Sequence, residues 1–224
     1  LTREAQLGRL PPLIGKKEAL SEAVRVLERR SKNHVLLVGA PGCGKTTLVY
    51  GIAVEIVKGT SSPGLSDKRL VMLDLSKLQA GAKTAGELQE RIHDVLDDIE
   101  HSGNVILFID EIHNAVAGGG GSETSVIFGA FVQRMEAGKF QVIGATSWDS
   151  YRKYVEPNTA FARLFERVEI AEATSDETLK VLEYVSGQLE SSEKVIVTLP
   201  AARAAIDLSR RYIYDRVLPD KAVD

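Results

Sequence analysis

The chain has 224 residues, of which 44% are hydrophobic and 26% are charged, and its formal net charge is −3. These values are typical of a globular protein with one large domain, or a large and a small one, and they do not indicate a nucleic-acid-binding surface. No apolar run is long enough to cross a bilayer, no signal peptide begins the chain, and the single cysteine cannot form an internal disulfide. We therefore expect a soluble protein of the cytoplasm, or of an organelle matrix or stroma, without a membrane partner.

Strands alternate with helices along most of the chain. Over the first half, apolar periodicity and turn residues predict a helix at 17–30, a strand at 35–38, a helix at 46–58, a strand at 70–75 and a helix beginning at Thr84. The second half is expected to contain a strand at 105–109, a helix at 122–137, a strand at 140–145, a helix at 148–154 and a short strand at 168–170. After Ala173 only helices are expected, around 179–189 and at 201–210. The pattern predicts a parallel-sheet α/β domain at 1–172 and a small helical domain at 173–224.

Residues 39–46 read Gly-Ala-Pro-Gly-Cys-Gly-Lys-Thr, a complete phosphate-binding loop between a predicted strand and a predicted helix. Glycines let backbone N–H groups turn toward phosphate oxygens, and the helix N-terminus adds partial positive charge. Lys45 is placed for the β- and γ-phosphates, and the Thr46 hydroxyl for Mg²⁺. The residues expected to contact ATP or ADP here are Pro41, Gly42, Cys43, Gly44, Lys45, Thr46 and Thr47.

Two acids, Asp110 and Glu111, follow the continuous apolar run at 105–109. Side chains at the carboxyl end of a buried strand lie where ligands bind in open α/β sheets. We predict that Asp110 holds Mg²⁺ and that Glu111 orients and polarises the attacking water. The alternative, an acidic surface turn, is disfavoured because the pair follows a phosphate-binding loop in the same chain.

These motifs, with Gly144-Ala145-Thr146-Ser147 and the following 151–154, resemble an AAA+ ATPase, and more narrowly the first ATPase module of the ClpA, ClpB and ClpC group of unfoldases and disaggregases. Leu13-Ile14-Gly15 resembles the family's entry segment, whose isoleucine lies near adenine, and 216–222, with Pro219, resembles its lid helix. The motifs occur in the family's order over nearly the whole chain. Because the chain starts with Leu and the family's lid continues past Asp224, we expect a piece of a longer protein with an incomplete lid.

The resemblance implies two further catalytic positions. A polar residue after the fourth strand senses the γ-phosphate in the family; Thr146 or Ser147 fits, and the family's Thr-Thr pair places the sensor at Ser147. A helix cap is a compatible second role for this residue. The family's arginine finger lies in an Arg-Arg-Phe run, which here reads Arg163-Leu164-Phe165, so Arg163 is the expected finger. A surface arginine in a salt bridge is the alternative.

The pore-loop segment departs from the family. Where the family threads substrate with an aromatic residue in a Lys-Tyr-Arg-Gly run, this chain has Lys83-Thr84-Ala85-Gly86. An aromatic ring grips an extended peptide through its buried area, which threonine cannot supply. The module is therefore expected either to grip weakly or to have a regulatory role.

The sequence-based interpretation is a Mg²⁺-dependent ATPase module of a hexameric ring that remodels protein substrates, with a protease or an adaptor as a further partner class. An isolated module could be monomeric. The alternatives are a regulatory or weakly translocating module, and a nucleic-acid-linked ATPase of the same class. The near-neutral charge and the lack of a basic stripe count against the latter, and no nucleic-acid partner is expected.

Overall fold

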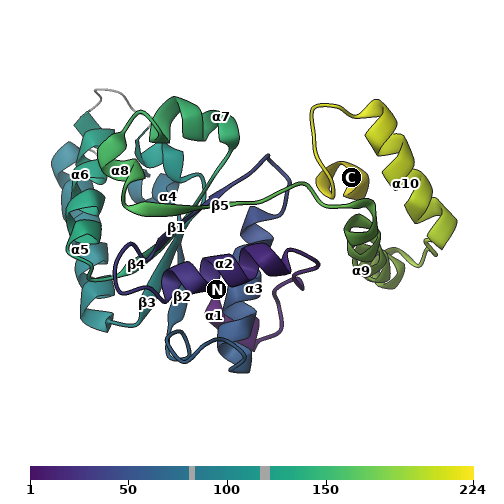
Figure 1. The fold of residues 1–224 in the computed structure, drawn as a ribbon, viewed down its shortest axis with the longest axis horizontal. Helices are drawn as coiled ribbons and strands as arrows, with labels where there is room; N and C mark the ends of the chain where they lie inside the picture. Colours follow the sequence, from purple (N-terminus) through teal and green to yellow (C-terminus); the bar gives the residue numbers. More distant parts are fainter. Residues whose placement is uncertain (81–83, 117–121) are drawn as a thin grey trace.

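The computed structural model describes residues 1–80, 84–116 and 122–224. At its centre is a five-stranded sheet in the order β2-β3-β4-β1-β5, in which all neighbouring strands are parallel. The strands are β1 (His34–Val38), β2 (Arg69–Leu73), β3 (Val105–Ile109), β4 (Gln141–Thr146) and β5 (Phe165–Glu169). A separate group of helices follows β5 (Figure 1). The predicted α/β fold with a helical lid is confirmed.

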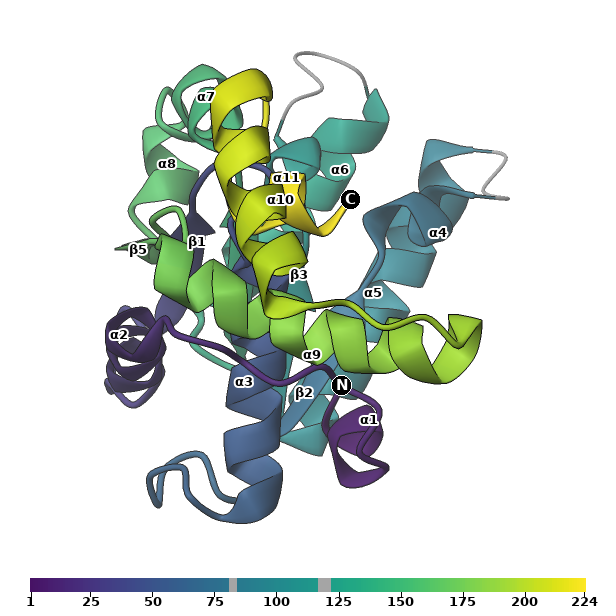
Figure 2. The same ribbon diagram turned by 90° about the vertical axis from the view of Figure 1, so that its right-hand side faces the viewer.

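Helices cover both faces of the sheet. One face carries α2 (Lys17–Leu27) and α3 (Lys45–Lys58), with α1 (Thr2–Gln6) beside α3 (Figure 2). The other face carries α4 (Leu75–Gln79), α5 (Ala85–Ser102) and α6 (Ser122–Glu136). Short elements complete this domain: the 3₁₀ turn η1 (Ile112–Ala115), α7 (Trp148–Ser150), the π-helical turn η2 (Tyr151–Val155) and α8 (Thr159–Ala162).

The central strands are buried on both faces, as their continuous apolar runs predicted. Side chains of β1 alternate: Leu36 and Val38 pack with α5 and α6, whereas Val35 and Leu37 pack with α2 and α3. All the residues of β1, β3 and β4 are buried. This two-sided core fixes the register of the strands, and with it the positions of the loops at their carboxyl ends.

The largest correction to the predicted elements is at the end of β2. The sequence predicted a strand through Leu75, but the strand ends at Leu73 and Leu75 begins α4. Asp74 causes the change, because its side chain caps the helix by accepting a hydrogen bond from the Lys77 backbone N–H at 3.2 Å. Apolar residues therefore occur on both sides of the Asp74 cap, and their pattern alone does not show where the strand ends.

Other differences are small. The predicted helix at 17–30 ends at Leu27, the strand at 140–145 is shifted by one residue, and the short strand at 168–170 is the longer β5. The predicted helix at 148–154 is divided into α7 and η2, and α1 and α8 were not predicted. The predicted glycine loop at 118–121, and residues 81–83 of the pore-loop segment, lie outside the described residues.

The lid consists of α9 (Ser175–Glu193), α10 (Leu199–Tyr212) and α11 (Asp220–Val223) around a small apolar cluster of Leu182, Ala202, Ile206, Leu218 and Ala222. A capping box begins α9, with Thr174 and Glu177 as its two partners. The expected lid helix at 216–222 is shorter and starts only at Asp220. In the described part of the chain, no helix has the length and apolar character needed to cross a membrane.

Candidate active site

The phosphate-binding loop joins β1 to α3 with the backbone that its glycines allow. Gly42 and Gly44 have φ values of 78° and 97°, which side-chain-bearing residues rarely adopt. Cys43 is buried, and its burial raises the pKa of the thiol, so the residue acts as a small packing group rather than a reactive thiolate. The loop and the N-terminus of α3 therefore border the same pocket, where backbone N–H groups at a helix start can bind an anion.

Lys45 and Thr46 begin α3 and already have polar partners. The Lys45 ammonium donates to the carbonyl oxygens of Gly39 at 2.9 Å and Ala40 at 2.8 Å. The Thr46 hydroxyl donates to Asp110 Oδ2 at 3.0 Å, which joins the loop to the end of β3. These contacts hold a cation and two oxygen groups at the carboxyl edge of the sheet before any ligand is considered.

Glu111 adopts a left-handed backbone conformation with φ 48° and ψ 45°. This conformation is uncommon for a residue other than glycine, and such outliers gather at functional sites. The Glu111 N–H donates to Asp110 Oδ1 at 3.0 Å, and its Oε2 accepts from Asn114 Nδ2 at 3.3 Å. The sharp turn therefore gives the two carboxylates different surroundings. Asp110 contacts Thr46, whereas Glu111 is exposed at the wall of the pocket described below.

The end of β4 supplies two hydroxyls with different partners. Thr146 is 1% exposed, and its Oγ1 lies 3.0 Å from His113 Nδ1 on η1. Ser147 caps α7, since its Oγ accepts from the Ser150 N–H at 3.2 Å. Burial lowers the pKa of His113, although Glu111 and Asp110 act in the opposite direction. A cap role for Ser147 is thus confirmed, and its role as a sensor stays a prediction.

These elements enclose one pocket of about 520 Å³. The predicted residues that line it are Pro41, Gly42, Lys45, Thr46, Asp110, Glu111, Thr146 and Ser147. A second, more apolar pocket of about 230 Å³ lies between the large domain and the lid. It is lined by the predicted residues Leu13, Ile14, Cys43, Gly44, Thr47 and Pro219. A polar pocket beside an apolar one matches the triphosphate and the base of a nucleotide.

Gly15 does not line either pocket but is the point at which the entry segment meets the lid. Its φ is 72°, and a side chain there would collide with Glu177 at the start of α9. Lys16 next to it donates to the carbonyl oxygen of Ala171. The entry segment therefore lies against the start of α9 and is tied to Ala171 just before the lid, directly beside the apolar pocket.

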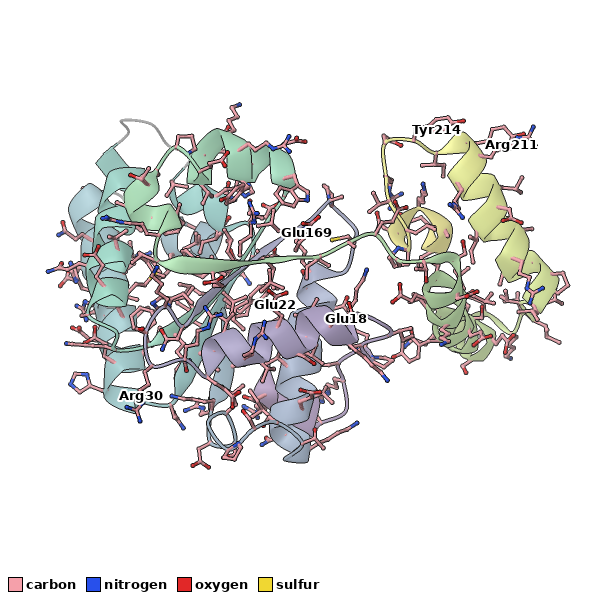
Figure 3. All side chains as sticks on the ribbon, in the orientation of Figure 1. Glu18, Glu22, Arg30, Glu169, Arg211 and Tyr214 are labelled. Atoms are coloured by element: carbon pink, nitrogen blue, oxygen red, sulfur yellow. The ribbon has the colours of Figure 1, made fainter. Side chains whose placement is uncertain are left out.

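Arg163 is the predicted site residue that the structure does not bring to this pocket. It is exposed, lies just before β5, and faces a different cavity of about 430 Å³ with Arg30 and Lys32. Because β5 runs parallel to β1, Arg163 is at the amino edge of the sheet, opposite the phosphate-binding loop. Arg30 lies on the side of the large domain away from the lid (Figure 3). No salt bridge is recorded for Arg163 among the described residues, contrary to the alternative considered from sequence.

Sequence reasoning missed part of the site. Asp74, Ser76, His113 and Asn114 line the polar pocket but are not among the site residues predicted from the sequence. The lid residues Tyr184, Val185 and Gln188 line the apolar pocket. A signal existed only for His113 and Asn114, which follow the two acids in the chain. The others are joined to the site by tertiary packing.

The residues present suit a bound magnesium ion. Mg²⁺ prefers oxygen ligands and usually keeps waters and substrate phosphates among them. Thr46 Oγ1 and Asp110 Oδ2 are 3.0 Å apart in the polar pocket and provide such oxygens. In the described ranges no group of three or more His, Cys, Asp or Glu side chains could hold a metal alone. The site therefore fits an ion that arrives with phosphate rather than one held by a protein cage.

Comparison with known proteins gives a consistent result. Residues 35–172 match the model of the ATPase family associated with various cellular activities (AAA), and residues 174–224 match an AAA lid domain. The chaperone protein ClpB of Oceanobacillus iheyensis is 39% identical over 224 residues, which is 100% of this chain and 28% of that protein. The ClpC/MecB protein of Bacillus subtilis, a negative regulator of genetic competence, is 38% identical over the same share of each chain.

Solved structures agree with the sequence relatives. The extended conformation of the Hsp104–casein complex of S. cerevisiae matches 100% of this chain and 38% of that chain, with a TM-score of 0.89 and 37% identity. A closed-state reconstruction of Hsp104 with ATPγS and FITC-casein matches with a TM-score of 0.88 and 38% identity, over 100% of this chain and 39% of that one. The chain covers 22% of the length of a second ClpB, from Aquifex aeolicus. It thus spans between a fifth and two fifths of the length of each protein compared here.

Proposed function

Because the chain belongs to the AAA ATPase family, with a region homologous to the first module of ClpB, ClpC and Hsp104, we propose that it binds Mg²⁺–ATP and hydrolyses the terminal phosphoanhydride bond. The observation that carries the proposal is the single polar pocket shared by Lys45, Thr46, Asp110 and Glu111. The adjacent apolar pocket between residues 1–172 and the lid at 173–224 suits adenine.

Each residue of the polar pocket has a distinct role. Two loop carbonyls hold the Lys45 ammonium, which keeps a further N–H for a phosphate oxygen. Thr46 and Asp110 would hold Mg²⁺, which when bound neutralises phosphate charge. Glu111 is the base that orients water, and its exposed carboxylate at the pocket wall is consistent with that role. Ser147 is the sensor hydroxyl at the end of β4.

We also propose that the module works in a ring, as a hexamer, in which Arg163 of one copy acts on the nucleotide of the next. Its exposure at the opposite edge of the sheet supports this arrangement, because a cation there cannot serve the pocket of its own chain. An arginine supplied from outside stabilises transition-state charge in phosphoryl transfer. A monomeric state of the isolated module remains compatible with the proposal.

The substrates that we propose are unfolded proteins, with a protease or an adaptor as a further partner. The support is the likeness to ClpB chaperones and to Hsp104 in structures with casein. A nucleic-acid motor and a purely regulatory module are not favoured by these relatives. In the same terms we propose a soluble protein of the cytoplasm, or of an organelle matrix or stroma.

The test measures ATP hydrolysis by the whole protein that contains this module. Unfolded casein should raise the rate, and single- or double-stranded DNA should leave it unchanged. Stimulation by DNA alone would favour the nucleic-acid alternative. Absence of hydrolysis despite nucleotide binding and confirmed assembly would reject the enzymatic proposal.

A further inference from the structure

His113 lies where three parts of the polar pocket meet. It sits on η1, two residues after Glu111, and lines the pocket together with Thr146 and Ser147. Its Nδ1 is 3.0 Å from Thr146 Oγ1. Its ring stacks on Tyr154 of η2, with centroids 6.1 Å apart and an interplanar angle of 13°. One side chain therefore joins the turn after β3, the end of β4 and the segment after α7.

The hydrogen-bond network assigns the direction of this contact. A threonine hydroxyl has one hydrogen to donate, and Thr146 directs its Oγ1 to the Ser147 carbonyl oxygen at 3.5 Å. With the hydroxyl hydrogen assigned to that carbonyl oxygen, the Thr146 oxygen accepts from His113, and the matching assignment for the ring is the Nδ1–H tautomer. Burial of His113 disfavours the charged ring, which agrees with a neutral imidazole that donates through Nδ1. The order of donation is His113 to Thr146 to the backbone of Ser147.

The chain of contacts bridges two groups that must keep a fixed separation. Glu111 directly precedes the short 3₁₀ turn η1, and its own backbone is in the uncommon left-handed conformation. Ser147 directly follows the Thr146 hydroxyl that His113 holds. Displacement of catalytic groups by about 1 Å costs as much as 10²-fold in rate. A rigid contact between the turn and the end of β4 would therefore raise the rate of hydrolysis.

We propose that His113 is a positioning residue that fixes the Glu111 turn against the end of β4 through the Thr146 hydroxyl. The inference rests on the proposed ATPase function and extends it. His113 does not contact the reacting atoms in this scheme. It sets the distance between the carboxylate that orients water and the hydroxyl that faces the terminal phosphate, and its stacking on Tyr154 holds the ring in place.

A double-mutant cycle tests the tie in the whole protein that contains this module. His113→Phe keeps a ring for Tyr154 but removes Nδ1, and Thr146→Val keeps the shape of the threonine but removes its hydroxyl. Each should lower kcat about tenfold while leaving KM for ATP within about twofold, because the tie matters for chemistry rather than for binding. The kcat of the double variant should lie within about twofold of the kcat of the less active single variant, since both substitutions remove the same contact.

Matched variants separate positioning from general damage. His113→Asn retains a donor near the position of Nδ1 and should recover most of the rate, whereas His101→Phe makes the phenylalanine exchange at an exposed site and should change nothing. ATP affinity by calorimetry reports folding of every variant. If the kcat losses of the two single variants multiply in the double variant, or if His113→Phe keeps the wild-type kcat, the inference about His113 is wrong. The proposed ATPase function would be unaffected by either result. An inactive wild-type assembly would instead remove the proposed function, and the inference with it.

Discussion

The two edges of the sheet differ in completeness. The carboxyl edge gathers a cation, carboxylates and hydroxyls around one pocket, and several of these groups already have hydrogen-bond partners there. The amino edge has Arg163, Arg30 and Lys32 around a cavity whose only described carboxylate is Glu136. One edge is thus a nearly finished site, while the other carries excess positive charge.

The difference fits the proposed ring, in which one module would both hydrolyse ATP and assist hydrolysis in its neighbour. Parallel strands send their carboxyl ends to the same side, so one chain can assemble the binding and water-activating groups by itself. A cation at the amino edge is separated from them by the length of the strands. In the proposed ring it would complete the site of another copy. The comparison therefore predicts different behaviour for variants at the two edges.

The largest effect should come from Arg163→Ala at the amino edge. Hydrolysis should fall by about 10³-fold with ATP binding nearly intact, because the arginine stabilises charge only in the transition state. Arg30→Ala, in the same cavity, is the matched control and should change the rate far less. Steady-state ATPase rates and calorimetry measure the two quantities.

Mixing variants tests whether the edges act across copies. Arg163→Ala and Glu111→Gln proteins, each inactive alone, should regain activity in mixed rings, since some interfaces then pair a normal Glu111 with a normal Arg163. Confirmed mixed rings without recovery would contradict action between copies and would require a different role for the amino edge.

Glu111→Gln at the carboxyl edge should lower kcat by about 10²-fold or more, because the amide keeps the shape but cannot activate water. ATP should still bind and remain trapped, as single-turnover measurements with radiolabelled ATP can show. Glu193→Gln, an exposed position on the lid, provides the control. Wild-type turnover in Glu111→Gln would show that another group acts as the base.

Lys45→Ala should weaken ATP binding by at least about tenfold, because the change removes the main phosphate cation of the carboxyl edge. Isothermal titration calorimetry measures the affinity. Lys58→Ala, at the far end of the same helix, should bind ATP as the wild type does. Equal affinity of Lys45→Ala and wild type would reject the site assignment.

Acid should lower the free energy of unfolding through His34, at the amino edge of the sheet. This buried histidine accepts a hydrogen bond from the Val142 N–H at Nδ1 and faces the Met135 carbonyl oxygen, and burial lowers its pKa. The unfolded chain then binds more protons, so the free energy of unfolding should fall as pH drops below about 6.5, by up to about 1.4 kcal/mol per pH unit. Urea unfolding from pH 8 to 5 measures it. His34→Gln should make the dependence shallower and leave the part due to His113, whose pKa burial also lowers, whereas exposed His101→Gln should not change it.

The smallest expected effect concerns the pore-loop segment. Thr84 caps α5 by accepting from the Glu87 N–H at 3.2 Å, so Thr84→Tyr exchanges a cap for a ring. If the grip is weak, substrate unfolded per ATP should rise about two- to threefold because the ring buries more area. Thr84→Ala removes the cap without adding a ring and is the matched control. An unchanged ratio in intact rings would mean that this loop does not grip.

Prediction from sequence placed residues in one pocket where they are neighbours in a contiguous motif. The phosphate-binding loop and the Asp110–Glu111 pair were found because a buried apolar strand leads directly into each. It failed where a single side chain overrode the pattern, as Asp74 does at the end of β2. The His113–Thr146 contact spans 33 residues, and the cavity around Arg163 is built from three separate segments. Neither has a local signature, so only the fold reveals them.

Two glycines at the border with the lid have a consequence for how this sequence can vary. Gly15 and Gly42 both have positive φ, and a β-carbon at either would run into a lid carboxylate side chain, Glu177 or Asp220. Gly42 is therefore constrained twice, by its own backbone and by the Asp220 β-carbon, whereas at Gly15 the end of the Glu177 side chain can move and the backbone is the main constraint. In a library of random variants these two sites should tolerate almost no exchange, and a survivor at Gly42 would have to compensate on the lid, at residue 220.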